Sequence, residues 1–381
     1  MKLTCTRDNL ANSLDQVSGV VDKNPNLPIL KNILITVKDS KVELTATNLE
    51  LTVKSTFRAK VEEDGEFTVP ASTLKDYIHL LNDEKVEIEL EGNELSVTCG
   101  TSSTQIKGED PEEYPVIPEV EEKFTYSLLA EPFRKAIKNT EIAVAKNEIR
   151  PELSGIYFGF FTERYDGLIL AATDSYRLAE KKMSVAQGDD EIECIVPGST
   201  ASEIARLISN AQSLTDESQV RISFNENQMI MRYGDFELSS RLIEGGYPDY
   251  AQIIPDSFSS ESTFPVDVMI QKIRAASLFT TAGVNSVEFR LNPSESKIEI
   301  SSDSTQKGEH EDQIEADISG DKNSILLNHR YVLDGLQNMD EEIEFKMNSS
   351  DSPCLFKETS IFYSKKVNIF REKGLILSIG R

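Results

Sequence analysis

The residue types that most often carry out chemistry are few in this chain and widely separated. The candidates are three histidines and four cysteines: His79, His310, His329, Cys5, Cys99, Cys194 and Cys354. Neither set has the close spacing of a metal site, and the sequence contains no phosphate loop, dinucleotide-binding fingerprint or nucleophile elbow. Free cysteines spaced in this way behave as small apolar residues and are typical of a reducing compartment. We therefore expect no catalytic residue, no bound metal and no cofactor.

Two acidic clusters are the remaining candidates for a cation site. They are Asp189-Asp190-Glu191 and Glu309-His310-Glu311-Asp312, and a solvated loop is the simpler interpretation of such runs. His79 and His329 fall in predicted helices, where a surface or core role is the simpler interpretation. An enzyme whose catalytic groups come from separate segments stays open as an alternative that the sequence does not suggest.

The composition is that of an ordinary globular protein with a strong acidic excess. The chain has 381 residues, a formal net charge of −25 and a pI near 4.6, and this length predicts two or three domains. An acidic chain argues against nucleic-acid binding, although binding depends on where the charges lie. The N-terminal residues lack the apolar core of a signal peptide, and no apolar run is long enough for a membrane span. We expect a cytoplasmic protein with no membrane partner.

A long-period repeat organises the chain. A short alternating strand followed by an amphipathic helix occurs three times, with the helices expected at 8–19, 131–146 and 267–280. A second helix is expected in each unit, at 71–82, 199–210 and 328–339; Val69-Pro70 and Val196-Pro197 open the first two, and the third lacks this pair. The pattern predicts three copies of one domain, each with two helices.

Alternating runs between the helices predict antiparallel sheets with one buried face. Residues 86–90 and 220–224 alternate in this way, and proline-rich junctions at 114–118 and 247–255 separate the units. The sequence therefore predicts an α+β fold of three repeated domains at 1–118, 119–257 and 258–381. Such an array has open sheet edges at its ends, and head-to-tail association into a ring would pair them.

The acidic charge is unevenly distributed along the chain. The six expected helices hold nine basic and eight acidic residues, while the rest of the chain holds 31 basic and 57 acidic ones. Helix surfaces with this balance could contact phosphates without reading sequence, and an acidic exterior would keep nucleic acid from other faces. Helices that are locally neutral without any such role are the alternative.

Several stretches, in this order and spacing, resemble the bacterial DNA polymerase III beta subunit, the sliding clamp. They are Leu27-Pro28-Ile29-Leu30, Ala172-Thr173-Asp174-Ser175-Tyr176-Arg177-Leu178-Ala179, Gly234-Asp235-Phe236, Tyr247-Pro248-Asp249-Tyr250 and Tyr331-Val332-Leu333-Asp334-Gly335-Leu336. The resemblance covers residues 1 to about 358. It implies a homodimer that closes head to tail as a ring, with double-stranded DNA in a hole lined by helices. It also implies a non-catalytic processivity factor that tethers a polymerase without reading sequence.

The resemblance also implies three sets of site residues. A pocket for short peptides of the polymerase catalytic subunit, the clamp loader and repair proteins would include Leu153, Thr173, Ser175, Tyr176, Arg177, Leu178, Pro248 and Ile253. Residues expected to face DNA are Lys23, Lys75, Arg134, Lys135, Lys138, Lys146, Asn147, Arg150, Arg206, Lys272 and Arg274. The dimer interface would join Thr104, Ile106 and Lys107 of one protomer to Leu278 and Phe279 of the other, although an apolar pair at a helix end is as often part of a core.

Two features depart from the family pattern. The Met-Pro-containing tail that completes the family's peptide pocket is absent, and Leu375, Ile376 and Leu377 stand near the end instead. Lys23 and Asn24 occupy a loop where some members place an arginine near DNA. The main alternative function is an interaction scaffold of three repeated domains that never encircles DNA.

Overall fold

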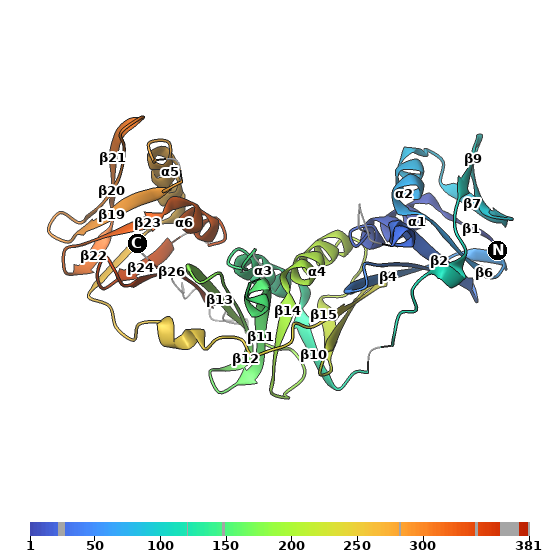
Figure 1. The fold of residues 1–381 in the computed structure, drawn as a ribbon, viewed down its shortest axis with the longest axis horizontal. Helices are drawn as coiled ribbons and strands as arrows, with labels where there is room; N and C mark the ends of the chain where they lie inside the picture. Colours follow the sequence, from blue (N-terminus) through green and yellow to red (C-terminus); the bar gives the residue numbers. More distant parts are fainter. Residues whose placement is uncertain are drawn as a thin grey trace. The chain divides into compact units, whose positions relative to one another are not determined.

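The computed structural model of the chain forms two compact units. It describes residues 1–21, 27–119, 121–146, 149–281, 283–339 and 342–358, and the backbone of 373–379. The first unit contains residues 1–134, 186–188 and 203–242, and the second contains 135–185, 189–202 and 243–381. Figure 1 labels many of the elements of both units.

The elements of the described residues follow one order three times: a strand, a helix, three strands, a second helix and three strands, with one or two further strands before the second helix. The first copy is β1 (Lys2–Thr6), α1 (Arg7–Val17), β2 (Asn32–Lys38), β3 (Lys41–Thr47), β4 (Leu51–Arg58), β5 (Lys60–Glu63), β6 (Gly65–Pro70), α2 (Ala71–Leu80), β7 (Lys85–Glu91), β8 (Glu94–Cys99) and β9 (Ser102–Lys107). The second is β10 (Phe124–Leu129), α3 (Ala130–Glu141), β11 (Gly155–Thr162), β12 (Tyr165–Thr173), β13 (Arg177–Met183), β14 (Ile192–Pro197), α4 (Gly198–Ala211), β15 (Gln219–Phe224), β16 (Gln228–Tyr233) and β17 (Phe236–Arg241). The third is β18 (Ser260–Pro265), α5 (Val266–Ser277), β19 (Ser286–Asn292), β20 (Lys297–Ser304), β21 (Gly308–Glu315), β22 (Asp317–Gly320), β23 (Asn323–Asn328), α6 (His329–Leu336), β24 (Glu342–Met347), β25 (Pro353–Glu358) and β26 (Lys373–Ile379). The α+β fold of three repeats that the sequence predicts is confirmed.

The first unit contains two antiparallel sheets. One has the order β5-β1-β7-β8-β9, and the other has the order β10-β15-β16-β17-β4-β3-β2-β6. The larger sheet joins two repeats, because β17 pairs with β4 in a register that places Leu238 opposite Val53. Both of these side chains are fully buried, so the join is part of a core as well as a ladder of backbone hydrogen bonds.

The helix α1 shows why the first repeat folds as it does. Leu10, Leu14 and Val17 recur at helical spacing and are almost completely buried, and α1 packs on β3, β4 and α2. The Thr6 hydroxyl caps the helix by accepting the Asn9 N–H at 3.3 Å, which satisfies a donor that would otherwise lack a partner.

The second unit repeats this plan. Its sheets have the orders β14-β11-β12-β13-β26-β25-β24-β18-β22 and β21-β20-β19-β23. The larger sheet again joins two repeats, here through pairing of β13 with β26. The helix α5 packs on β19, β20, β21 and α6 and buries Met269, Ile273 and Ala276 completely.

The helices of the described residues begin within one residue of the predicted starts, and all but α4 end earlier. The largest difference is at α3, which was expected to reach residue 146 and ends at Glu141; the placement of Lys146 in this helix is therefore wrong. The last turn tightens because Ala143 N–H donates to Thr140 O and Val144 N–H to Glu141 O. The chain then leaves the helix direction because Ala145 N–H donates to Leu153 O.

Within the described residues, no helix is long and apolar enough to cross a membrane.

Candidate functional site

A tight turn between β12 and β13 carries most of the residues expected in the peptide pocket. The Asp174 carboxylate accepts the N–H groups of Tyr176 and Arg177, each at 3.0 Å, and the Thr173 hydroxyl donates to Arg177 O at 2.7 Å. Ser175 adopts a left-handed φ of 74°. Short polar side chains that bond to the nearby backbone favour such turns, and this one presents Tyr176 with 56% of its surface exposed.

Arg177 ties this turn to the last helix of the chain. Its buried guanidinium donates to Asp174 at 3.2 Å and to Asp334 of α6 at 2.7 Å. The same group lies 4.4 Å from the centre of the Tyr331 ring. A planar guanidinium can make both kinds of contact at once, which a lysine cannot, so the turn is held firmly against α6.

Three tyrosines lie beneath the turn. Tyr157, Tyr247 and Tyr250 pack with ring centres 5.5 to 6.3 Å apart, and the Tyr247 hydroxyl accepts the Thr173 N–H at 2.9 Å. Leu178 belongs to the same buried cluster. The Tyr247-Pro248-Asp249-Tyr250 stretch thus holds the turn in place through Tyr247. The short helix Tyr250–Ile253 follows this stretch.

A buried polar network anchors this tyrosine cluster. The Tyr250 hydroxyl donates to the Glu180 carboxylate at 2.8 Å, and Arg164 donates to the same carboxylate at 2.9 Å. The Arg164 guanidinium also lies 4.3 Å from the centre of the Tyr250 ring. Burial, and then the neighbouring Glu180 charge, raise the pKa of Tyr250 far above its usual value of about 10, so its hydroxyl stays a donor at neutral pH.

The expected pocket residues all lie in the second unit, and they differ in exposure. Ser175, Tyr176 and Ile253 are exposed and Pro248 is half-buried. The other four are buried: Leu153, Thr173, Arg177 and Leu178.

Some residues that hold the site were not in the expected pocket list. Tyr247, Tyr331 and Asp334 all lie in motifs that the sequence singled out, so the motifs were the available signal. Leu375, Ile376 and Leu377 belong to β26, whose backbone pairs with β13 and β25; their side chains lie outside the described part of the chain.

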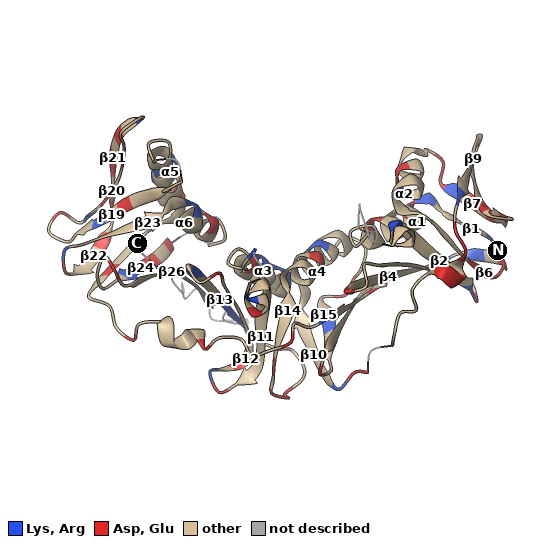
Figure 2. Ribbon diagram, in the orientation of Figure 1, with Lys and Arg blue, Asp and Glu red and all other residues tan. Residues whose placement is uncertain are grey.

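The basic residues expected to face DNA differ in how they are paired. Six of them form ion pairs with carboxylates: Lys75, Arg134, Lys138, Arg150, Arg206 and Lys272. Within the described ranges, no ion pair is found for the exposed side chains of Lys135, Lys146 and Arg274. Lys23 and Asn147 lie outside the described residues. The six α-helices hold nine basic and eight acidic residues with their observed bounds, and Figure 2 shows both signs on them.

Asp15 and Arg206 illustrate how tightly some of these charges are held. Asp15 of α1 accepts from Lys75 at 2.8 Å and lies 3.1 Å from His79. Burial alone would raise the pKa of Asp15, but the hydrogen bonds from Lys75 and His79 lower it below its usual value. Arg206 donates to the backbone oxygens of Asp15 and Gln16 at 2.9 and 2.6 Å. The Lys75 and Arg206 cations are therefore committed to the protein itself.

The residues expected at the dimer interface lie on an edge strand of each unit's smaller sheet, or next to such a strand. Thr104, Ile106 and Lys107 lie on β9, an edge strand of the five-stranded sheet. Leu278 follows α5 and is 67% exposed. Phe279 stacks on His310 of β21, with ring centres 5.5 Å apart and planes 8° apart, and β21 is an edge strand as well.

The histidines and cysteines do not assemble into a reactive group. Burial raises the pKa of the Cys5 thiol to about 12, which disfavours the reactive thiolate. Burial also lowers the pKa of His329. Among the residues with a described position, no cluster of His, Cys, Asp or Glu could hold a metal ion.

Comparison with known proteins connects these features to one family. Three models of the DNA polymerase III beta subunit match the chain: the N-terminal domain at residues 1–118, the central domain at 127–249 and the C-terminal domain at 251–370. The chain belongs to this family. Its members are sliding clamps, processivity factors that are non-catalytic subunits of DNA polymerase III.

Individual relatives agree with this assignment. The beta sliding clamp of Synechococcus elongatus is 29% identical over 361 residues, which cover 93% of this chain and 95% of that one. The crystal structure of the DNA polymerase sliding clamp from Bacillus subtilis has a TM-score of 0.90 at 26% identity, with 100% of this chain and 99% of that chain covered. A sliding clamp from Pseudomonas aeruginosa, solved bound to griselimycin, has a TM-score of 0.89 at 24% identity, with the same coverage.

The Tyr250–Glu180 hydrogen bond leads to a stability prediction. Tyr250→Phe should lower the free energy of unfolding by about 1–3 kcal/mol at neutral pH, because Glu180 loses a buried donor. The raised pKa means that the folded state holds the phenol proton more tightly than the unfolded state. Wild-type stability should therefore fall as pH rises above about 10, and the fall should be shallower in Tyr250→Phe.

Denaturant unfolding at several pH values measures both effects. Tyr176→Phe, which removes an exposed hydroxyl near the same site, is the matched control. An alkaline loss as steep in Tyr250→Phe as in the wild type would show that this phenol does not carry the effect.

Proposed function

We propose that this chain acts as a sliding clamp by closing head to tail with a second copy into a ring around double-stranded DNA. The observation that carries the proposal is the pairing between repeats. The last strand of the second repeat, β17, pairs with the fourth strand of the first, β4. The last strand of the third repeat, β26, pairs in the same way with β13 of the second.

If the last strand of each repeat pairs with the fourth strand of the repeat before it, one last strand and one fourth strand remain without such a partner within the described chain. The last strand of the first repeat is β9, and the fourth strand of the third repeat is β21; both are sheet edges in the described chain. Open edges tend to pair with another strand. Pairing β9 of one protomer with β21 of the partner, and the reverse, would continue the rule through six repeats and leave neither edge open.

One exposed apolar side chain beside β21 supports the same interface, whereas Ile106 on β9 is buried within its own unit. Leu278 is a large apolar residue exposed beside β21, and Phe279 packs on that strand through His310. Thr104, Ile106 and Lys107 lie on β9. We propose that these two groups meet across the dimer, with the domains divided at 1–118, 119–257 and 258–381.

The ring would hold DNA by topology and contact it weakly. The proposed DNA-facing basic residues include three exposed ones without an ion pair in the described chain, Lys135, Lys146 and Arg274. Phosphate contacts through such groups are independent of sequence and sensitive to salt. Few and mobile contacts are compatible with sliding, because a ring does not need affinity to stay on its track.

Partner proteins would bind at the turn between β12 and β13. Tyr176, Ile253 and Pro248 offer accessible apolar surface above the rigid cluster of Arg177 and the tyrosines. Pockets of this kind combine apolar anchors with a few orienting polar groups. We propose that short peptides of the polymerase, the clamp loader and repair proteins bind there.

A closed ring should stay on circular DNA because it encircles the DNA, and this retention should depend on the dimer interface. Wild-type protein placed on nicked circular DNA by the cognate clamp loader should stay with the circle through gel filtration and leave it once the DNA is linearised. Leu278→Asp should convert the dimer to monomers in analytical ultracentrifugation and abolish retention, because a buried unpaired carboxylate is strongly unfavourable. Leu214→Asp, at another exposed leucine, is the control. Equal retention on circular and linear DNA would contradict the ring.

The exposed basic residues predict a charge-specific effect. Lys135→Glu combined with Arg274→Glu should release the clamp from circular DNA at lower salt than the wild type, because phosphate contacts are lost. Arg58→Glu combined with Lys307→Glu changes the net charge equally outside the helices and should have little effect. Recovery of clamp with DNA at rising salt is the measurement, and equal losses for the two pairs would place the DNA-facing surface elsewhere.

The peptide pocket predicts an effect of one exposed ring. We propose that griselimycin, with which the Pseudomonas aeruginosa clamp was solved, binds this pocket. Tyr176→Ala should then weaken its binding by roughly tenfold or more, as expected for an aromatic anchor, and should leave the dimer intact. Leu326→Ala, at an exposed leucine on β23, is the matched control. Isothermal titration calorimetry measures both affinities. An unchanged affinity in Tyr176→Ala would refute the assignment of the pocket.

A further inference from the structure

The turn that carries Tyr176 has a second copy in the first repeat. The Thr47 hydroxyl donates to Leu51 O at 3.1 Å, and Asn48 accepts the N–H groups of Glu50 and Leu51 at 3.1 and 2.8 Å. Leu49 adopts a φ of 76°, against 74° for Ser175. Each bond has its counterpart in the turn from Thr173 to Arg177, so the chain builds one turn at both joins between repeats.

The proline-rich junction after the first repeat also matches the one after the second. Tyr114 precedes Pro115 as Tyr247 precedes Pro248, and each tyrosine hydroxyl bonds to the backbone of the strand before its turn. The Tyr114 hydroxyl donates to Thr45 O at 3.3 Å. The first join therefore has the same two components, a turn and a tethered linker, as the proposed peptide pocket.

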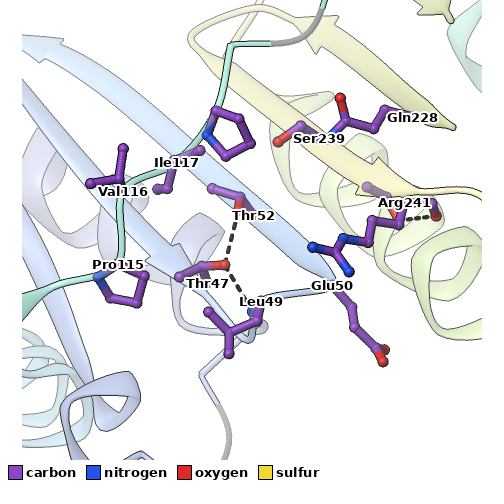
Figure 3. Close-up of a pocket in the computed structure, with 12 residues that line it drawn as sticks. Thr47, Leu49, Glu50, Thr52, Pro115, Val116, Ile117, Gln228, Ser239 and Arg241 are labelled. Atoms are coloured by element: carbon purple, nitrogen blue, oxygen red, sulfur yellow. Dashed lines mark hydrogen bonds between the residues drawn. The ribbon is translucent and has the colours of Figure 1, made fainter.

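A cavity of about 230 Å³ lies between these components, within the first unit. Figure 3 shows the linker on one side, the turn in the middle and β17 on the other. Six of its lining residues carry the argument: Leu49, Thr52, Pro115, Ile117, Ser239 and Arg241. Leu49 is 48% exposed, and Val116, which also lines the cavity, is 94% exposed. Large apolar side chains left in water at a cavity are a common mark of a binding surface.

The strand registers show how the chemistry of the two joins differs. Ser240 stands opposite Leu51, and Ser378 stands opposite Arg177. Arg241 in the first join therefore corresponds to Ile379 in the second, where the sequence is apolar. An arginine at this position of the last strand is thus specific to the first join, whereas the guanidinium at the second join, Arg177, belongs to the turn and is paired with Asp174 and Asp334.

The Arg241 side chain is available to a ligand. It is exposed, and no carboxylate of the described residues forms an ion pair with it. Figure 3 shows its guanidinium directed toward the turn, while the Glu50 carboxylate points away. The backbone there is fixed, because Arg241 N–H donates to Glu50 O at 3.0 Å. A guanidinium carried by a fixed backbone can bind a carboxylate through two hydrogen bonds.

We propose that this cavity is a second peptide-binding pocket, which takes a short extended segment of a partner protein with an apolar side chain next to a single carboxylate. Leu49 and the linker would receive the apolar side chain, and Arg241 the carboxylate. The net charge of −25 disfavours strongly acidic segments at long range, so one carboxylate suits the pocket better than several. The proposal goes beyond the function proposed above and rests on it only for the comparison of the two joins; the Arg241 test reads the first join alone.

Two labelled peptides test the pocket in the full-length protein. The probes are fluorescein-labelled Gly-Ser-Val-Leu-Asp-Ser-Gly and the same peptide with Asn in place of Asp, measured by fluorescence anisotropy on protein that carries Tyr176→Ala to disable the other pocket. The Asp peptide should bind roughly tenfold more tightly than the Asn peptide. Arg241→Glu should remove this preference, whereas the control Arg58→Glu, at another exposed arginine of the same sheet, should preserve it.

A second variant tests the apolar part of the pocket. Leu49→Asn introduces a residue type that tolerates the left-handed backbone and should weaken the binding of both peptides. Equal affinity for the two peptides, no binding of either up to ~1 mM, or equal effects of Arg241→Glu and Arg58→Glu would each overturn the proposal. The arginine comparison stands by itself if Leu49→Asn fails to fold.

Discussion

Backbone pairing between the last strand of one repeat and the fourth strand of the repeat before it is the interaction on which the structure depends. It fuses the sheets of neighbouring repeats, at β4 with β17 and at β13 with β26, and it buries Val53 and Leu238 at one of these joins. It also brings the turn after the third strand of the first and second repeats next to the linker that leads to the following repeat. The proposed partner sites therefore lie at the joins between repeats.

Charge is arranged so that the protein can be both acidic and compatible with DNA. The acidic excess lies outside the helices. On and near the helices, many cations are engaged by neighbouring carboxylates or by backbone oxygens, as Arg206 is. Such pairing weakens the attraction of these cations for phosphates. A surface that attracts phosphates only weakly is what movement along DNA requires, since a strong attraction would slow it.

Hydrophobic periodicity and the repeat predicted much of this fold from the sequence, including the six helices and the antiparallel sheets. It failed at the end of α3, because the competing bond from Ala145 to Leu153 comes from a segment eight residues away. The motif around Tyr176 pointed to the candidate site, but the ties from Arg177 to Asp334 and from Tyr247 to Thr173 cross long stretches of chain. Alternation of polar and apolar residues indicates that one face of a strand is exposed to solvent, but it does not indicate which strands pair. The pairing between repeats could therefore be seen only in the structure.

The joins within one chain differ from the proposed joins between two protomers in covalent connection, because only the former are linked by the backbone. At the two joins within a chain, a linker of modest length keeps the strands at a high effective concentration, so a separated pair closes again quickly. The join between β9 and the partner's β21 has no such tether in the proposed ring. Of the six joins between repeats in the proposed ring, the two between protomers would therefore be the ones that open. A loading protein would need to separate only one of them to admit DNA.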